Sequence, residues 1–274
     1  MSSLRRSLLL LLPFTLLACT PDEPGSEAGT ETEAGDGDGD GDGDGDGDGD
    51  GDGDGDGDGD PGELVRVSGD AFAFGPGTMV ANATVTILEL ADQQATTDAD
   101  GHFDFDALPA GAAATFVFEK AGYPTIYTKT FTLPDSGVVE RVTFQAPDDA
   151  TFAALAQIVS ITPDPAACQI ASTVTRVGKS LYDEGAHGEA GATVTITPSL
   201  PAEHGPVYFN ANVIPQADLT ETSDDGGVLY TNVPPGTYVL SASKDGVVFE
   251  DVTVQCEPDV LVNPSPPHGL QALP

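Results

Sequence analysis

The chain has 274 residues and a formal net charge of −36, with 45 acidic side chains against nine Lys and Arg. So few basic residues exclude a nucleic-acid-binding role, because neutralising phosphates requires a basic surface. The charge is uneven, since residues 35–60 hold 13 Asp and no base. About 210 residues follow this acidic stretch, enough for one or two folded domains.

The N-terminus reads as a targeting segment. A pair of arginines precedes an apolar stretch of about a dozen residues, too short to span a bilayer as a helix. The stretch ends in LLAC at 16–19, which resembles the lipobox of bacterial lipoproteins. The resemblance implies that residues 1–18 are a signal peptide and that Cys19 is acylated and anchors the protein to a membrane. Thr20 in place of Asp implies the outer membrane, with the protein either periplasmic or surface-exposed; an ordinary secretory signal is the alternative.

Residues 19–62 are predicted to form a disordered acidic tether. Within them, 35–60 is Gly-Asp repeated 13 times. Glycine has no side chain to bury and neighbouring aspartates repel each other, so nothing offsets the entropy of ordering. An array of carboxylates that binds Ca²⁺ is the alternative, but a flexible array lacks the preformed geometry of a specific site. We therefore expect a solvated spacer.

Beyond the tether the hydrophobic pattern has a period of two. ATVTIL at 83–88 alternates apolar and polar residues, and GHFDFD at 101–106 places Phe103 and Phe105 on one face. Further β-rich runs follow at intervals of roughly 8–12 residues, separated by Gly, Pro and Asp. This arrangement is typical of an all-β sandwich.

The β-rich segments occur twice. NATVTI at 82–87 matches GATVTI at 191–196, TTDADGHF at 96–103 matches TSDDGGV at 222–228, LPAG at 108–111 matches VPPG at 233–236, and EKAGY at 119–123 matches SKDGV at 243–247. The difference in residue number between matching positions of the two copies is larger at the second match than at the first. This indicates an insertion in the second copy at about 197–221. We therefore predict two β-sandwich domains, at 63–146 and 166–264.

A linker at 147–165 separates the two predicted domains, and a tail at 265–274 follows the second. Asp149 is a candidate cap for a short helix in the linker, with Phe152, Leu155 and Val159 on one stripe. We expect this helix to lie against one of the sandwiches.

These motifs, in this order, resemble the carboxypeptidase regulatory-like domain, a transthyretin-like sandwich. The first copy carries the matching residues Ala83, Val85, Ile87, Thr97, Asp100, Gly101, Phe103, Leu108, Pro109, Gly111, Lys120, Gly122 and Tyr123; the second carries Pro234, Gly236, Tyr238, Lys244 and Gly246. In the second copy Val228 and Val247 replace the Phe and Tyr. The resemblance implies two tandem seven-stranded, Ig-like or prealbumin-like sandwiches. It implies little about function, because such modules act as adhesive, regulatory or spacer units.

The stretch TTDADGHFDF at 96–105 is similar in composition to a calcium-binding loop. With Gly101 at the sixth position of an EF-type loop, Thr96 takes the first position and Ala107 the twelfth, and neither is a carboxylate. Asp and Gly are also the residues of tight turns. We predict a turn between strands, and no metal site.

Cys168 and Cys256 remain once Cys19 is acylated. They flank the second domain, and exported proteins favour disulfides, so we predict a bridge that clips both ends of that sandwich. The alternative is a redox or nucleophilic cysteine. It is disfavoured because neither residue belongs to a CxxC motif or has a neighbouring histidine.

Two histidines frame the first matched strand of the second copy. His187 and His204, with Glu184, Glu189 and Glu203 nearby, are candidates for a metal or acid–base cluster. The alternative is solvated loop histidines, and whether the two form a site is left open. No recognised catalytic motif is present. We predict no enzyme, no catalytic residue, no metal and no cofactor, although a hydrolase with a scattered site stays a third hypothesis.

The insertion EHGPVYFNANVIP is the most distinctive surface candidate. Tyr208 and Phe209 are suited to stacking on sugar rings, and Asn210 and Asn212 to hydrogen bonding; the alternative is that the two rings extend the core or cover a sheet edge. The sequence thus predicts a non-catalytic cell-envelope lipoprotein that presents two interaction or spacer modules to a glycan or an envelope protein. The alternative is a carbohydrate-binding protein that uses the insertion.

Overall fold

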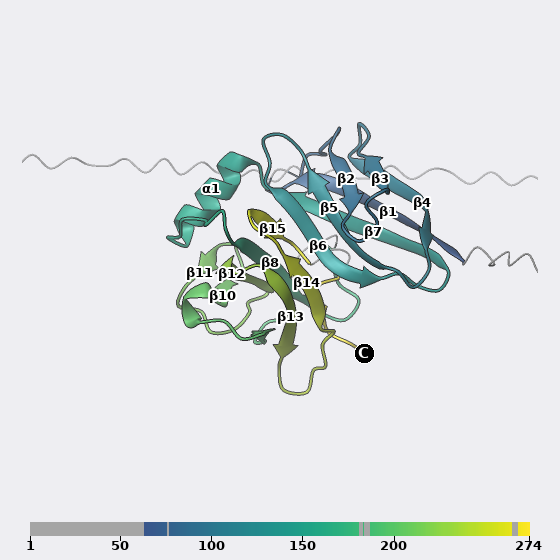
Figure 1. Ribbon diagram of the computed structural model, residues 1–274. Coiled ribbons are helices and arrows are strands. Elements are labelled where there is room, and N and C mark those ends of the chain that lie inside the picture. Colours follow the sequence, from purple (N-terminus) through teal and green to yellow (C-terminus); the bar gives the residue numbers. More distant parts are fainter. Residues whose placement is uncertain (1–62, 76, 181–182, 184–186, 265–267) are drawn as a thin grey trace, which may run out of the picture. The chain divides into compact units, whose positions relative to one another are not determined.

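The computed structural model describes residues 63–75, 77–180, 183, 187–264 and 268–274. The predicted signal peptide, Cys19 and the acidic tether lie outside these residues. Over the described ranges, sixteen β-strands are accompanied by a single α-helix and a single 3-10 turn, so the all-β prediction is confirmed (Figure 1). No helix there has the length and apolar character needed to cross a bilayer.

The first seven strands form a sandwich of three strands against four. They are β1 (Leu64–Ala73), β2 (Thr84–Ile87), β3 (Gln94–Thr96), β4 (His102–Pro109), β5 (Ala113–Glu119), β6 (Thr125–Thr132) and β7 (Gly137–Ala146). One sheet has the order β4-β1-β7, and the other contains the run β6-β5-β2-β3. Phe103 and Phe105 are buried as the alternation predicts, and Phe144 packs against Phe103 with ring centroids 5.8 Å apart.

The second half adds nine strands. They are β8 (Cys168–Thr175), β9 (Thr193–Thr197), β10 (Val207–Phe209), β11 (Pro215–Gln216), β12 (Gly227–Val233), β13 (Gly236–Ser243), β14 (Val252–Cys256), β15 (Val260–Val262) and β16 (Leu270–Gln271), with the 3-10 turn η1 (Ala202–His204). The sheet β14-β13-β9 faces the run β11-β10-β12-β8-β15, and β16 pairs with β8. These nine strands exceed the predicted seven, and two of them, β10 and β11, form within the insertion. The predicted tail supplies β16, whose Leu270 is fully buried.

The two halves share one sheet. Strand β15 pairs in parallel with β6 on one side and with β8 on the other, so the sheet runs from β11 to β3 (Figure 1). Val260 and Val262 are in the core of the second half, whereas Leu261 packs into that of the first. The repeat predicts two separate sandwiches and gives no sign of this pairing. The two cores are distinct clusters, but one strand belongs to both.

Helix α1 (Asp149–Ile158) lies in the predicted linker. Its cap is Asp148 rather than Asp149, because the Asp148 carboxylate accepts a hydrogen bond from the Thr151 amide at 2.7 Å. This hydrogen bond holds the pKa of Asp148 below its usual value. The predicted helix is confirmed, with its N-terminal cap moved by one residue.

The sequence repeat extends to individual hydrogen bonds. The Thr97 hydroxyl accepts from the Ala83 amide at 2.8 Å, and the Thr222 hydroxyl accepts from the Ala192 amide at 2.9 Å. Each hydroxyl also donates to a backbone carbonyl. The two lysines of the repeat also make equivalent hydrogen bonds. Lys120 donates to the Ala81 carbonyl, and Lys244 donates to the Ala190 carbonyl. The two copies therefore use the same local geometry to begin their matched strands, β2 and β9.

Candidate functional site

Residues 97–101 form a tight turn that connects β3 to β4. The Asp98 carboxylate accepts hydrogen bonds from the amides of Asp100 and His102, at 2.8 and 2.9 Å. Gly101 has a φ of +74°, which favours glycine. The Asp98 side chain therefore holds the turn, as its residue type predicts. Among the described residues, no three His, Cys, Asp or Glu side chains gather as a metal would require.

His102 belongs to a partly exposed charged cluster on β1 and β4. Its Nδ1 lies 2.8 Å from an Asp70 carboxylate oxygen, and its Nε2 lies 3.0 Å from one of Asp104. Arg66 also contacts Asp104, at 2.6 Å. The hydrogen bond with Asp70, assisted by the negative charge of Asp104, raises the pKa of His102 above its usual value. The arrangement stabilises a protonated imidazole on an open strand surface.

The raised pKa of His102 predicts a pH dependence of stability. Because the folded protein holds this proton more tightly than the unfolded chain, the stabilisation is complete below the unfolded pKa of about 6.5 and is lost as pH rises through the folded pKa. We expect His102→Gln to remove this dependence, which urea unfolding at a series of pH values from about 5 to 9 measures. An unchanged profile in the variant would contradict the assignment. Because the second copy has Gly227 at the equivalent position, no compensating histidine is expected there.

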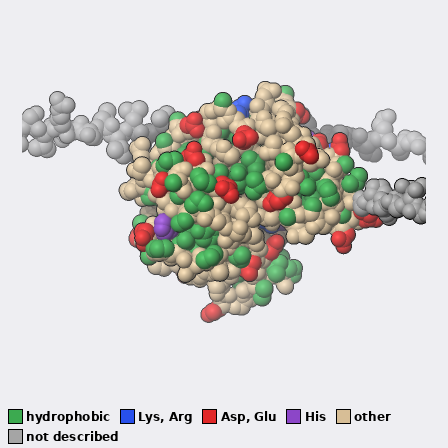
Figure 2. All heavy atoms as spheres, viewed as in Figure 1, with side chains coloured by type: hydrophobic (Ala, Val, Ile, Leu, Met, Phe, Trp, Pro, Cys, Tyr) green, Lys and Arg blue, Asp and Glu red, His purple; other side chains and the backbone are tan. Residues whose placement is uncertain are grey.

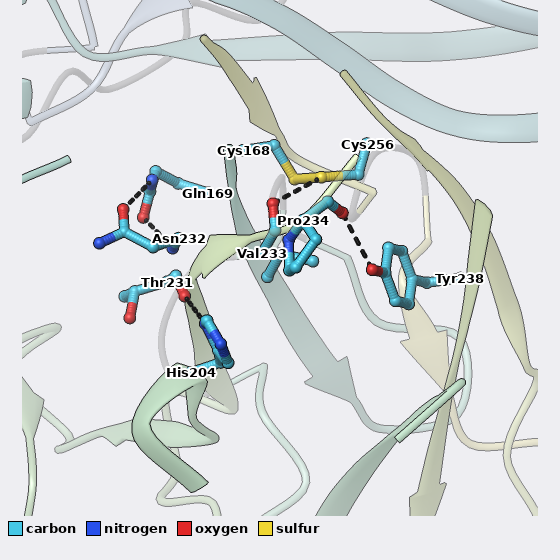
Figure 3. The surroundings of a disulfide bond; sticks show 9 residues. All are labelled: Cys168, Gln169, His204, Thr231, Asn232, Val233, Pro234, Tyr238 and Cys256. Atoms are coloured by element: carbon cyan, nitrogen blue, oxygen red, sulfur yellow. Dashed lines mark hydrogen bonds between the residues drawn. A yellow bond between two sulfur atoms is a disulfide. The ribbon is translucent and has the colours of Figure 1, made fainter. Parts of the chain in front are cut away.

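The predicted disulfide between Cys168 and Cys256 is present, with the two Cα atoms 5.6 Å apart. Cys168 begins β8 and Cys256 ends β14, so the bond joins the two facing sheets of the second half. Figure 3 shows Tyr238 beside it, with its hydroxyl donating to the Pro234 carbonyl at 2.9 Å. Both cysteines are fully buried. The bond is therefore a structural clip and offers no accessible thiol.

The four residues proposed for a ligand surface do not act together. Tyr208 is only 3% exposed, and its hydroxyl accepts from the Val194 amide at 2.9 Å, so its assignment to a ligand surface is wrong. The Asn210 side chain accepts from the amides of Asn212 and Ile214 and so shapes its own loop. Phe209 is partly exposed and lines two hollows. Asn212 is exposed.

His187 and His204 lie in different surroundings. The His204 ring is 2.9 Å from the Thr231 carbonyl (Figure 3), whereas His187 lines a hollow that does not include His204. Glu189 pairs with Lys244 instead of either histidine. Glu184 lies outside the described residues. The described members of the predicted cluster therefore do not converge on a metal.

An apolar cavity lies between helix α1 and the shared sheet. Its volume is about 110 Å³. The predicted helical stripe forms one wall, with Phe152, Leu155 and Val159 facing the cavity. The opposite wall comes from both halves of the chain, including Phe74, Leu229 and Leu261. A mainly apolar lining offers an ordered water few hydrogen-bond partners and suits an apolar group.

A more polar hollow of about 160 Å³ adjoins this cavity, because Phe74, Gln145, Ala171, Phe209 and Asn263 line both. It adds His187 and Asp225. Burial raises the pKa of the Asp225 carboxyl, against the effect of a hydrogen bond from the Gly227 amide at 3.1 Å. We name the two together the composite pocket. An apolar end and an acidic end are its main chemical features.

The first copy is similar to a known domain family. Residues 73–147 match the carboxypeptidase regulatory-like domain. The match covers the first sandwich from the end of β1 to just beyond β7, which agrees with the resemblance found in its motifs. A search of curated proteins gives no match to the sequence.

Solved structures that resemble this chain do so at low similarity. The minor pilin of Streptococcus agalactiae is 13% identical, with a TM-score of 0.25 and coverage of 77% of this chain and 97% of the pilin. A putative carbohydrate-binding protein from Bacteroides uniformis is 11% identical, with a TM-score of 0.28 and coverage of 71% and 98%. The Bacillus anthracis TIE protein is 12% identical, with a TM-score of 0.26 and coverage of 77% and 34%, so this chain spans about a third of its length. These values carry no functional argument.

The sequence motifs do not single out Asp225, but a difference between the two copies at a neighbouring position could have indicated it. At the position where the first copy has His102, the second copy has Gly227. A Cβ atom on Gly227 would lie 2.5 Å from an Asp225 carboxylate oxygen and 2.8 Å from Cγ of Phe209. The loss of a side chain at this one position therefore makes room for both the carboxylate and the ring. Divergence between the two copies marks the composite pocket.

Proposed function

We propose that this protein is a non-catalytic lipoprotein of the bacterial outer membrane that acts as an adhesive or spacing module. The shared sheet is the observation that supports this most directly. A strand that pairs with both halves, together with a disulfide between the facing sheets, makes a stiff unit suited to bearing a load. Structural disulfides persist in oxidising compartments, which supports an envelope location.

The segment before the sandwiches suits this role. In the proposal Cys19 carries the lipid, and residues 19–62 hold the sandwiches away from the membrane. A flexible Gly-rich chain of this length spans roughly 35–40 Å on average, and repulsion between aspartates extends it further. A partner such as a glycan or an envelope protein would then be reached at a distance from the bilayer.

Binding of carbohydrate through the insertion is less well supported. Stacking on a sugar needs exposed aromatic faces. Tyr208 is in the core, which leaves Phe209 as the one aromatic ring of the predicted surface, and that ring faces the composite pocket. We therefore prefer the adhesive or spacer function to the glycan-binding alternative.

Removing the acylation site tests the proposal. In cells that express the full chain, we expect Cys19→Ala to abolish incorporation of a labelled fatty acid and to move the protein from the membrane fraction to the soluble fraction, because the lipid supplies the anchoring energy. A second variant that lacks residues 35–60 is expected to stay membrane-bound while an epitope tag on the sandwiches becomes less accessible to antibody.

Cys168→Ala is the matched control, because it removes a cysteine from the sandwich and leaves Cys19 in place; it should retain the label. A Cys19→Ala protein that stays labelled or membrane-bound would refute lipid anchoring. A tag that is equally accessible with and without residues 35–60 would refute the spacer role.

A further inference from the structure

The composite pocket has no role in the proposed function, and its apolar end is large enough for one small group. The volume of about 110 Å³ is somewhat below the roughly 150 Å³ of an engineered apolar cavity that binds benzene. Leu155 on α1, Val159 directly after this helix, and Leu229 and Leu261 on the sheet supply much of the lining. One aromatic ring or a short alkyl group matches this end in size and polarity.

The polar end has hydrogen-bonding groups that the described residues do not satisfy. The His187 Nδ1 atom is buried and has no hydrogen-bond partner there. Asp225 accepts a bond from the Gly227 amide at one of its carboxylate oxygens. Buried polar atoms in folded proteins are generally paired, so an unpaired one points to an absent ligand group or solvent. Both residues line the same hollow.

The charges around the pocket favour a ligand with a positive charge. Asp225 places a carboxylate in the hollow, and the chain carries a net charge of −36. Acidic side chains also far exceed basic ones on the face shown in Figure 2. An anionic group would be repelled, whereas an ammonium group would be attracted and carries three N–H donors. Burial raises the pKa of the Asp225 carboxyl, so this carboxylate would gain from a cationic partner.

The two ends are close enough for one small molecule to reach both. A Cβ atom on Gly227 would meet both the Asp225 carboxylate and the Phe209 ring, so these two groups lie side by side over this glycine. Phe209 in turn lines the apolar cavity as well as the polar hollow. We propose that the composite pocket binds a small organic amine, with its aromatic or short alkyl group under α1 and its ammonium group at Asp225 and His187.

Titration calorimetry on the detergent-solubilised full-length protein tests this with three matched probes. These are 2-phenylethylamine, the neutral 2-phenylethanol and the anionic phenylacetate. We expect the amine to bind at least about tenfold more tightly than either of the others, because only the amine forms a charge-assisted hydrogen bond with a carboxylate. Equal affinity for the three probes, or no binding of the amine, would overturn the proposal.

Variants identify the site. Asp225→Asn is expected to weaken binding of the amine by about tenfold or more and to leave the alcohol within about threefold. Asp224→Asn is the matched control, since Asp224 is an exposed neighbour that pairs with Arg176, and it should leave the affinity for the amine unchanged. Ala156→Phe fills the apolar end from α1 and should abolish binding of the amine and the alcohol alike.

Unfolding temperatures of the three variants show whether each protein is folded, and if Ala156→Phe fails to fold, Leu155→Phe replaces it at the same wall. Amine binding that survives both Asp225→Asn and the cavity-filling change would place the ligand elsewhere and overturn the assignment. An equal loss on Asp224→Asn and Asp225→Asn would show a general charge effect and would also overturn it.

Discussion

Replacing both Cys168 and Cys256 by alanine is expected to lower the free energy of unfolding by about 4–5 kcal/mol. The two residues are 88 positions apart, and cross-linking a loop of that length removes much of the entropy of the unfolded chain. The bond also joins the two facing sheets of the second half, so its loss frees them to separate. Urea unfolding of the double variant against the parent, both with Cys19→Ala to remove the lipid, measures the difference.

Reduction provides the control for this prediction. A reducing agent should destabilise the parent by a similar amount and leave the double variant unaffected. Because β15 pairs with β6 as well as β8, we expect both halves to unfold in a single transition that shifts as a whole. A loss below about 1 kcal/mol would contradict the role of the clip. Two separate transitions, of which only one moves, would contradict the coupling of the halves.

Local patterns predicted much of this fold. The alternation around Val85 and Phe103 placed their side chains in the core, because successive residues of a strand point to opposite faces. The repeated motifs anticipated hydrogen bonds that recur at Thr97 and Thr222. The spacing of apolar residues also predicted the helix, and the expected oxidising compartment predicted the disulfide.

The pairing of β15 with strands of both halves could not be predicted in this way. Strand β15 is only the three residues Val260–Val262, and all three are buried. A run so short has no periodicity that indicates a strand, and its uniform burial is typical of a parallel strand covered on both faces. The shared sheet was therefore not evident in the sequence, even though both cores depend on it.

The proposed ligand surface failed for a related reason. In strand β10, Tyr208 and Phe209 are adjacent and must point to opposite sides of the sheet. The sequence does not indicate which side is interior, and the structure buries Tyr208. Asp225 was missed because its setting depends on Gly227 and Phe209, which the fold brings together from separate segments.

Gly226→Ala is expected to destabilise the protein by about 3 kcal/mol. Gly226 has a φ of +78°, where an alanine costs about 1–2 kcal/mol. In addition, its Cβ would lie 2.2 Å from the carbonyl oxygen of Val174, a backbone atom that cannot move aside alone. The Gly226 carbonyl also accepts from the Val174 amide at 2.9 Å, so relieving the clash strains that pairing. Urea unfolding measures the loss.

Gly246→Ala separates the two contributions. Gly246 has nearly the same φ, +77°, but nothing lies within 4 Å of its Cβ position, so only the backbone cost of about 1–2 kcal/mol is expected. The first copy offers an independent check, because a Cβ on Gly101 would lie 2.5 Å from the Ala71 carbonyl oxygen at the equivalent turn. If Gly226→Ala and Gly246→Ala cost the same, the close approach at the turn has no energetic weight, and the Asp-Gly pair of the repeat would then be retained for its φ angle alone.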